Sequence, residues 1–426
     1  MAEKNNPPAK ASYVPQDSMF LWWLTDPAAP RLIGELSLVD KVRRVALRYS
    51  ENWLKSGTAL SEDLPLQARL FVPEVQDSAV GAVDDARPDR WGERVIRAID
   101  KPKRLSLLEY LYFAGDNRFG ALGVSLIPEA YSPSPTASLP MISEVARIHD
   151  IVRKVAAGEA IEERERRLVS PGRTMGGAKP KSLVQIDSAE WVLKFADEYD
   201  HDWPLIEHAT MAMGRLCGID MCETRAVPFA RNRTAIAVRR FDRHAGGARR
   251  HCISAGVALR AAGEAEGYPE LAGVFRRLLG AETQAAARAQ LFRRMVFNIL
   301  VDNTDDHERN HALVLSDTGD AGDAGDAGYV LSPAYDVVPA MQILRYQALR
   351  VGSEQSDATL HNAMTECSAF GLTKDQAAGV VREVCAVVGD WQSLMAGQGV
   401  GKRDLAALEP FLQGDKAAMR AEFTGR

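Results

Sequence analysis

Residues 298–317 read NILVDNTDDHERNHALVLSD, and two different chemistries compete for this stretch. From His307 to His311 it reads H-E-x-x-H, the signature in which two histidines bind zinc. Asp305 and Asn310 are spaced like the catalytic base and the metal-binding Asn of a protein-kinase catalytic loop. The residues around the stretch decide which of these chemistries, and therefore which fold, the chain is built for.

The context of the motif does not suit a zinc site. Zinc binding by H-E-x-x-H needs both histidines on one face of a helix, one turn apart. The helical pattern before the motif ends near residues 302–305, which are good turn formers. The segment ALVLS after His311 has the pattern of a strand, and Arg309 places a charge in the middle of the motif. A zinc hydrolase is therefore the weaker alternative.

The composition sets wider limits on function. The chain has 426 residues, of which 46% are hydrophobic and 26% charged, and a formal net charge of -5. This predicts a globular protein of two or three domains, and argues mildly against direct nucleic-acid binding. Five cysteines without a C-x-x-C pair indicate neither a disulfide framework nor a cysteine zinc site. Without a signal-peptide core or a long apolar run, the sequence predicts a cytoplasmic protein with no membrane partner.

The order of elements can be predicted from periodicity. Alternation from Phe20 to Leu54 predicts short antiparallel strands, and residues 105–127 read as a helix, a turn and a strand. Residues 142–167 read as helical, with a solvated charge run. SLVQI and EWVLKFA predict a hairpin, followed by a helix ending at Gly218 and two more strands. After about residue 255 the pattern is mainly helical.

Further kinase parts follow one another in the expected order. Phosphoryl transfer is mostly positioning and charge neutralisation, so it needs a carboxylate, metal ligands and a lysine for the phosphates. Lys194 lies inside the strand EWVLKFA, and Glu207 opens the next helix, as in the kinase Lys–Glu ion pair. Asp336 follows the strands HALVLS and YVLS, where a kinase has its second metal-binding Asp. Taken singly, each of these residues could have an ordinary structural role. Their order along the chain favours the kinase interpretation.

Two segments between these parts are predicted to be loops. Residues 174–181, TMGGAKPK, form a Gly-containing turn before a strand and are a candidate phosphate cradle. They match neither the Walker A loop nor the G-x-G-x-x-G of protein kinases. The Gly-Asp-Ala repeats from Gly319 to Ala327 predict a flexible turn rather than a calcium-binding β-roll.

Taken together, the segments resemble the HipA-like serine/threonine kinases, the toxin halves of bacterial toxin–antitoxin pairs. The resemblance covers the whole chain and rests on TMGGAKPKSLV, AVRRFDR, NTDDHERN and SPAYDVVP, with DARPDRWGERVI and YLYFAGDNRFGALGV near the N-terminus. It implies an α+β, two-lobed protein-kinase-like fold. The implied divisions are a disordered tail (1–18), a β-rich N-terminal subdomain (19–140), a small lobe with the Gly loop and hinge (141–245) and a mainly helical C-terminal lobe (246–426).

The resemblance also implies cofactors and roles. ATP and Mg²⁺ would be the cofactors, Asp305 the catalytic base, and Asn310 and Asp336 the metal ligands. The implied nucleotide-binding residues are Gly176, Gly177, Ala178, Lys179, Lys181, Lys194, Arg239, Arg240, Phe241, His307, Arg309 and Tyr335. Within this set, Gly176–Ala178 and Lys181 would form the loop above the phosphates, and backbone groups of Arg239–Phe241 would meet the adenine.

Three positions depart from the family pattern. Thr174 stands where family members carry the serine that they autophosphorylate, so it is the candidate autophosphorylation site, and slower or absent autoinhibition is expected. Lys179-Pro180 replaces a Gln-acid pair in the loop, and Arg239 replaces a hinge glutamate. The Asp, Asn, Asp and Lys set is intact, which argues against an inactive kinase.

The resemblance implies a function and partners. The chain would be a serine/threonine protein kinase that arrests growth by phosphorylating a translation component such as an aminoacyl-tRNA synthetase. It would bind a HipB-like helix-turn-helix antitoxin, and operator DNA only through that antitoxin. Two alternatives stay open: a small-molecule kinase, and a non-catalytic nucleotide-binding corepressor that acts with the antitoxin.

Overall fold

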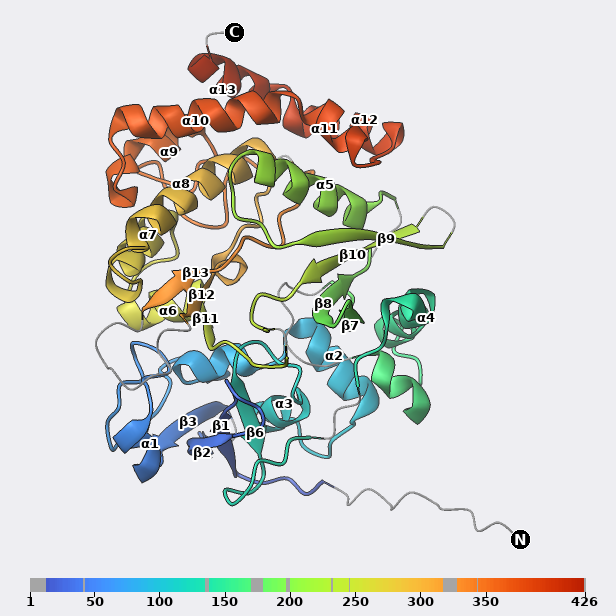
Figure 1. Cartoon of the computed structure of the whole chain (residues 1–426), viewed down its shortest axis with the longest axis vertical. Coiled ribbons are helices and arrows are strands. Elements are labelled where there is room, and N and C mark those ends of the chain that lie inside the picture. The colour runs from blue at the N-terminus through green and yellow to red at the C-terminus, as the bar shows by residue number, and fades with distance from the viewer. Residues whose placement is uncertain are drawn as a thin grey trace.

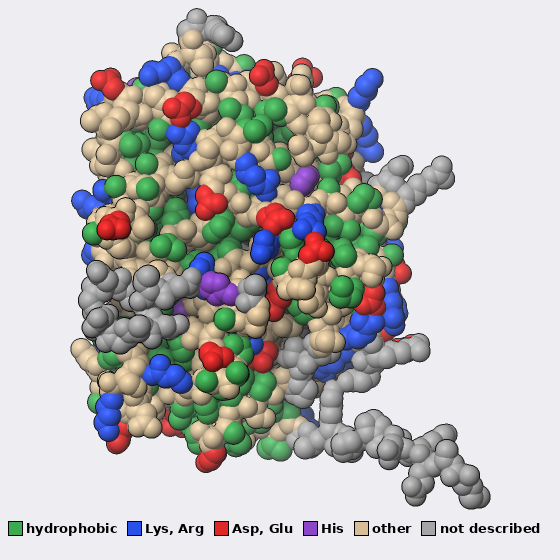
Figure 2. Space-filling model, viewed as in Figure 1, with side chains coloured by type: hydrophobic (Ala, Val, Ile, Leu, Met, Phe, Trp, Pro, Cys, Tyr) green, Lys and Arg blue, Asp and Glu red, His purple; other side chains and the backbone are tan. Residues whose placement is uncertain are grey.

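A computed structural model gives the arrangement of most of the chain (Figure 1). It describes residues 13–40, 43–134, 138–169, 179–196, 200–230, 233–244, 246–316, 328–342 and 344–424. The N-terminal sheet lies at the bottom of Figure 1, the small lobe at its middle right and the C-terminal helices at its top. Among the described residues, no helix is long and apolar enough to cross a membrane. Acidic and basic side chains are interspersed over most of the face in Figure 2.

The N-terminal subdomain is built on a six-stranded sheet with the order β4-β3-β2-β1-β6, in which β5 pairs with β3. Its strands are β1 (Ser18–Trp23), β2 (Arg31–Val39), β3 (Arg44–Tyr49), β4 (Leu70–Phe71), β5 (Ser78–Ala79) and β6 (Leu122–Ser125). Its helices are α1 (Glu51–Ser56), the 3₁₀ turn η1 (Gly81–Ala86), α2 (Arg90–Ile99) and α3 (Leu107–Phe113). The predicted antiparallel pairing of the first strands is confirmed.

Two details of this subdomain differ from the prediction. The residues after β3 form helix α1 instead of a strand, because the Ser50 side chain accepts a hydrogen bond from the Trp53 backbone N–H and caps the helix. The packed chain also begins earlier than residue 19. Tyr13 stacks on Tyr112, with ring centroids 5.6 Å apart, and donates to Glu109 at 2.7 Å. Of the predicted tail, residues 1–12 lie outside the described part of the chain.

The small lobe is a four-stranded antiparallel sheet with the order β7-β8-β10-β9. Its strands are β7 (Lys181–Ile186), β8 (Ala189–Lys194), β9 (Thr224–Ala230) and β10 (Arg233–Arg239), and its main helix is α5 (Trp203–Leu216). The predicted hairpin β7–β8 is confirmed. The predicted helix over 142–167 is interrupted, and consists of η2 (Ile142–Glu144), α4 (Val145–Ala156) and η3 (Glu163–Leu168). Helix α4 packs on the sheet through a second apolar cluster that includes Ile148 and Trp191.

The large lobe is mainly helical, as predicted. Its helices are α6 (Ala255–Ala262), α7 (Tyr268–Leu278), α8 (Gln284–Leu300), η4 (Glu308–Asn310), α9 (Leu360–Thr365), η6 (Cys367–Phe370), α10 (Lys374–Gly389), α11 (Trp391–Gly397), α12 (Lys402–Leu412) and α13 (Asp415–Thr424). A small sheet joins β11 (Cys252–Ser254), β12 (Ala312–Leu315) and β13 (Tyr329–Leu331). The sequence pattern predicted the last two strands but missed β11. The Gly-Asp-Ala repeats lie outside the described residues.

A buried histidine joins the N-terminal subdomain to the large lobe. His251 is 1% exposed, lies 4.9 Å from the Trp23 ring and donates through Nε2 to the Leu60 carbonyl at 2.8 Å. Burial lowers the pKa of His251 to about 4. A histidine with a lowered pKa contributes stability that is present above its unfolded pKa of about 6.5 and is lost as the pH falls towards the folded value.

Acidification is therefore expected to weaken this junction. Between pH 7.5 and pH 5, His251 alone should cost about 2 kcal/mol of folding free energy. The check is the midpoint of chemical denaturation at both pH values for the wild type and His251→Phe. The variant should lose stability at pH 7.5 and also lose part of the pH dependence. His361→Phe, at an exposed site on α9, is the control. Equal pH dependence in wild type and His251→Phe would contradict the expectation.

Candidate active site

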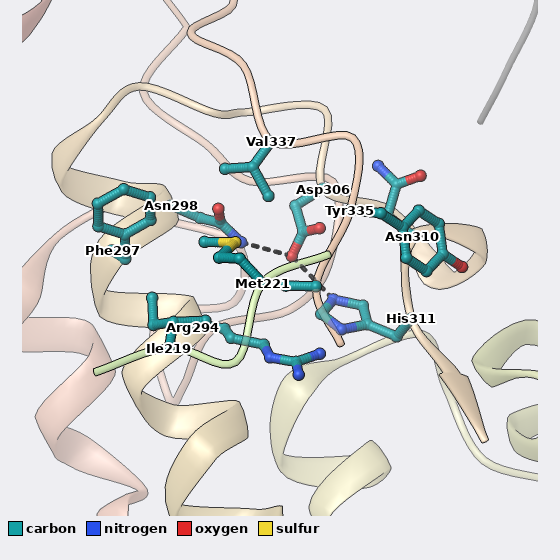
Figure 3. A pocket seen from close by; sticks show the side chains of 11 residues that line it. Ile219, Met221, Arg294, Phe297, Asn298, Asp306, Asn310, His311, Tyr335 and Val337 are labelled. Carbon is teal, nitrogen blue, oxygen red and sulfur yellow. Dashed lines mark hydrogen bonds and ion pairs between the residues drawn. The ribbon is translucent and has the colours of Figure 1, made fainter. Parts of the chain in front are cut away.

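The loop between α8 and η4 holds two adjacent aspartates in opposite environments. Asp305 is exposed, whereas Asp306 is 2% exposed. The Asp306 carboxylate accepts hydrogen bonds from Asn298 Nδ2 at 2.8 Å and His311 Nε2 at 2.9 Å (Figure 3). It also accepts one from Tyr268 Oη. Burial would raise the pKa of Asp306, but His311 and Tyr268 lower it below its usual value. Asp306 therefore anchors the loop, and Asp305 is the carboxylate available for chemistry.

Asn310 presents an oxygen that has no partner among the described residues. Its Nδ2 donates to the Asp305 carbonyl at 3.1 Å, which fixes the orientation of the amide. Its Oδ1 is buried and accepts no hydrogen bond from any described residue. In Figure 3 the amide lies beside the Tyr335 ring and points away from Asp306. Because buried polar atoms are nearly always paired, this oxygen suits a ligand, and amide oxygens are ligands of hard cations such as Mg²⁺.

Three charged side chains from three elements meet at the centre of the site. Lys194 Nζ, on β8, lies 2.7 Å from Glu207 Oε1 on α5 and 2.7 Å from Asp336 Oδ1. The Lys194 and Glu207 side chains are 4% exposed and that of Asp336 is 15% exposed. Burial opposes the charges of Lys194 and Asp336, but the carboxylates raise the pKa of Lys194, and Lys194 together with Lys179 lowers the pKa of Asp336. Lys194 and Asp336 are therefore both charged at neutral pH.

The segment that carries Asp336 is held from two sides. Ala334 exchanges backbone hydrogen bonds with the loop after α5, donating to the Asp220 carbonyl at 2.7 Å and accepting from Cys222 at 2.9 Å. The buried Arg294 on α8 donates to the Ser332 carbonyl at 2.7 Å. Asp336 itself has a φ of +58°, in the left-handed region that non-glycine residues rarely adopt. Such a conformation persists where the surroundings enforce it, which is common at functional sites.

Tyr335 connects this segment to the loop that carries Asp305 and Asn310. Its hydroxyl donates to the Arg309 carbonyl at 2.9 Å, directly before Asn310. The Phe241 ring, at the end of the linker between the lobes, lies 5.5 Å from the Tyr335 ring. Asp336, Asn310 and Asp305 therefore belong to one connected constellation, as their order in the sequence predicts.

The structure places the predicted phosphate loop only in part. Thr174, Gly176, Gly177 and Ala178 lie outside the described residues. Lys179 is exposed and lines a cavity together with Lys194 and Asp305.

Lys181, expected in this loop, is instead the first residue of β7. Its side chain is 2% exposed and lies 2.9 Å from Asp89 Oδ2 of the N-terminal subdomain, while Trp91 Nε1 donates to its carbonyl at 2.7 Å. The prediction missed these contacts because both partners come from α2 and its N-cap, far away in the sequence.

The linker Arg239–Phe241 also differs from the expectation. The backbone N–H of Arg239 donates to the Glu223 carbonyl at 2.9 Å, and that of Arg240 to the Glu190 carbonyl at 3.1 Å. Neither donor is therefore available to an adenine. The Arg239 side chain is exposed beside Glu223, at 3.1 Å. Of the groups expected to bind the nucleotide here, the Arg239 and Arg240 carbonyls and Phe241 remain.

The Arg240 side chain takes part in a buried ion network. It donates to Asp242 at 2.7 and 2.9 Å and to the carbonyls of Asn117 at 3.0 Å and Arg118 at 2.9 Å. Asp242 is 0% exposed and also accepts from the Gly120 backbone N–H at 2.8 Å. Arg240 is thus committed to the N-terminal subdomain and not to a nucleotide. The alternating charges of residues 240–243, RFDR, are the signal of this network in the sequence.

The H-E-x-x-H motif does not form a zinc site. His307 Nδ1 accepts from the Arg309 backbone N–H at 3.2 Å, so it caps the short turn η4. Arg309 is exposed, with its Nε 3.4 Å from Glu308. His311 points the other way, to Asp306. Within the described residues, no group of three or more His, Cys, Asp or Glu side chains could hold a metal ion.

Comparison with known proteins agrees with this geometry. Residues 173–391 match the HipA-like C-terminal domain, and residues 28–125 match the HipA N-terminal domain. The chain belongs to the HipA family. A curated relative, named "Putative kinase Y4dM", from Sinorhizobium fredii, is 27% identical over 172 residues, which are 35% of this chain and 37% of that protein. The chain thus spans little more than a third of the length of this relative.

The HipA fold extends over nearly the whole chain. The HipA of Shewanella oneidensis MR-1, solved in a complex with HipB and its operator DNA, is 18% identical, with a TM-score of 0.63. The alignment covers 96% of this chain and 95% of that one. The α+β, kinase-like architecture expected from the sequence is therefore confirmed.

Proposed function

We propose that this HipA-family chain is an ATP-dependent serine/threonine protein kinase. The observation that carries the proposal is the contact of Lys194 with both Glu207 and Asp336, because kinases use such a lysine for the nucleotide phosphates and such an aspartate for the metal. The exposed Asp305 and the unpaired Asn310 oxygen supply the remaining parts. The name of the Sinorhizobium relative supports the same activity.

Each side chain has a defined task in this proposal. Asn310 Oδ1 and the Asp336 carboxylate would hold Mg²⁺, which when bound neutralises phosphate charge. Lys194, kept protonated by its two carboxylates, binds phosphate oxygens. Asp305 orients the acceptor hydroxyl and accepts its proton, as a carboxylate within reach of solvent and substrate can. The Asp306 anchor keeps the loop in place during this step.

The proposal extends to a biological role. We infer that the kinase is the toxin of a toxin–antitoxin pair, with a HipB-like helix-turn-helix antitoxin as partner and operator DNA reached only through it. The Shewanella protein was solved with these partners, which supports the inference. The expected substrate is a translation component in the cytoplasm, such as an aminoacyl-tRNA synthetase. Co-purification of this chain with the small protein encoded next to it tests the partner. A search for synthetase phosphopeptides in cells that overexpress this chain tests the substrate.

The decisive experiment is intact-mass analysis after incubation with ATP and Mg²⁺. Wild type should gain a phosphoryl group and lose this gain when EDTA is added. Asp336→Asn, which keeps the shape but removes the charge that faces Lys194, should show no gain while its denaturation midpoint stays within a few degrees of wild type. Mapping the group to Thr174 would assign the autophosphorylation site.

Other outcomes separate the remaining candidates. No gain in wild type, with tight ATP binding, would favour a non-catalytic nucleotide-binding corepressor. ATP turnover with a small acceptor, without protein phosphorylation, would favour a metabolite kinase. An equal gain in Asp336→Asn would overturn the assignment of this site.

A further inference from the structure

A cavity of about 640 Å³ is lined by Asp305 and by many apolar residues that have no part in the proposed nucleotide site. Lys179, Lys194 and Glu207 also line it. The remaining lining is mostly apolar and comprises Phe195, Ala196, Trp203, Pro204, Val338, Pro339, Ala340, Leu344, Tyr346 and Ala348, with Thr304 and Gln342. The proposed catalytic base and an apolar wall therefore line the same cavity.

The wall is held in a fixed position relative to Asp305. The Ala348 backbone N–H donates to the Thr304 carbonyl at 3.0 Å, directly before Asp305 in the chain. Gln347 donates to the Ser356 carbonyl at 2.7 Å, and Tyr346 forms a β-bridge with Asp357. Leu344 and Tyr346 therefore stand on a segment braced against the catalytic loop, and not on a free loop.

Four of the lining residues carry charges, namely Lys179, Lys194, Glu207 and Asp305. Lys194 and Glu207 pair with each other at 2.7 Å. The apolar wall includes Leu344, which is partly buried, and Tyr346, which is 56% exposed. A large exposed aromatic side chain next to an apolar pocket is typical of binding surfaces. Apolar and aromatic residues outnumber the polar ones in the lining, so the cavity suits an apolar side chain better than a sugar or another hydroxyl-rich metabolite.

We propose that this cavity binds the acceptor segment of a polypeptide substrate and selects a Ser or Thr flanked by an aliphatic or aromatic residue. The inference rests on the proposed kinase function. The acceptor hydroxyl lies at Asp305 while its apolar neighbour packs against Leu344, Tyr346 and Trp203. The hydroxyl oxygen bonds to the γ-phosphorus of ATP, the bond from that phosphorus to the β–γ bridging oxygen breaks, ADP leaves, and the hydroxyl proton passes to Asp305.

The test is a peptide library with a fixed Ser or Thr and randomised flanking residues, phosphorylated by the full-length chain with Mg-ATP. Wild type should select Leu, Ile, Met or Phe next to the acceptor. Tyr346→Ala should lower kcat/KM for the selected peptide about tenfold, mainly through KM, as loss of one apolar contact does. Leu344→Glu should shift the preference towards Lys or Arg at the flanking position. Loss of structure alone would not produce that shift.

Leu216→Glu is the matched control, because Leu216 is a leucine 61% exposed at the end of α5, outside the cavity lining. This variant should keep the wild-type preference. Phosphorylation without an apolar preference would overturn the inference, and so would self-phosphorylation with no peptide accepted. If neither self-phosphorylation nor ATP turnover is seen, the proposed kinase function itself fails. Failure of the inference is therefore distinguishable from failure of the function.

Discussion

Replacing Asp305 by Asn is expected to lower kcat for phosphoryl transfer by about 10²- to 10⁴-fold, the usual contribution of a positioned general base. Asp305 is exposed and its side chain makes no hydrogen bond or ion pair to another described residue. The substitution should therefore leave the denaturation midpoint close to that of wild type. Nucleotide affinity should also be nearly unchanged, because Lys194 and Asp336 are retained. Steady-state kinetics and a denaturation curve on the same preparation check both expectations.

The neighbouring residue provides the contrasting variant. Asp306→Asn exchanges a buried carboxylate with three donors for an amide that can accept from fewer of them. Removing one partner from such a network costs roughly 2–5 kcal/mol, so this variant should lose stability as well as activity. The opposite pattern, with a stable, inactive Asp306→Asn and a fully active Asp305→Asn, would reassign the base. The same experiment tests whether Asp305 and Asp306, the two aspartates of the T-D-D-H sequence, have separate tasks.

The sequence predicted the elements of the site better than it predicted their environments. The hydrophobic periodicity and the turn residues encode hairpin β7–β8 and helix α5 locally. The sequence could therefore predict that Lys194 lies on a strand and Glu207 on a helix. Asp305 and Asp306 stand side by side in one turn, and local pattern cannot show which one faces solvent. That is decided by Tyr268 and Asn298, which reach Asp306 from α7 and α8.

Contacts between distant segments account for the other differences. Lys181 looked like a loop lysine because its partner, Asp89, lies 92 residues away. Arg240 looked like part of a nucleotide-binding linker because its carbonyl partners lie in residues 117–118, between α3 and β6. In contrast, helix α1 could have been predicted, since Ser50 followed by Glu51 is an N-cap signal. Long-range pairing, more than secondary structure, limited the prediction.

The network at Asp242 carries the second large expected effect. Asp242 pairs with Arg240 at 2.7 Å and with Arg243 at 2.9 Å, and is 0% exposed. Burial opposes its charge, but the two arginines lower the pKa of Asp242 well below its usual range, so it is ionised in the fold. Asp242→Ala would leave two buried guanidinium groups without their main counterion. We expect the free energy of unfolding to fall by about 3–5 kcal/mol.

The loss should extend beyond stability, because this network joins the lobes to the N-terminal subdomain. Asp242 accepts from the Gly120 backbone, and Arg243 donates to the carbonyls of Arg118 at 2.7 Å and Gly120 at 3.0 Å. The linker at Phe241 would lose its support, so nucleotide affinity should fall and proteolysis between the subdomains should accelerate. Asp77→Asn, in an exposed pair with Arg43, should change neither property, since exposed pairs contribute little. An Asp242→Ala protein with wild-type stability and protease resistance would show that apolar contacts such as Trp23 against His251 suffice to hold the subdomains together.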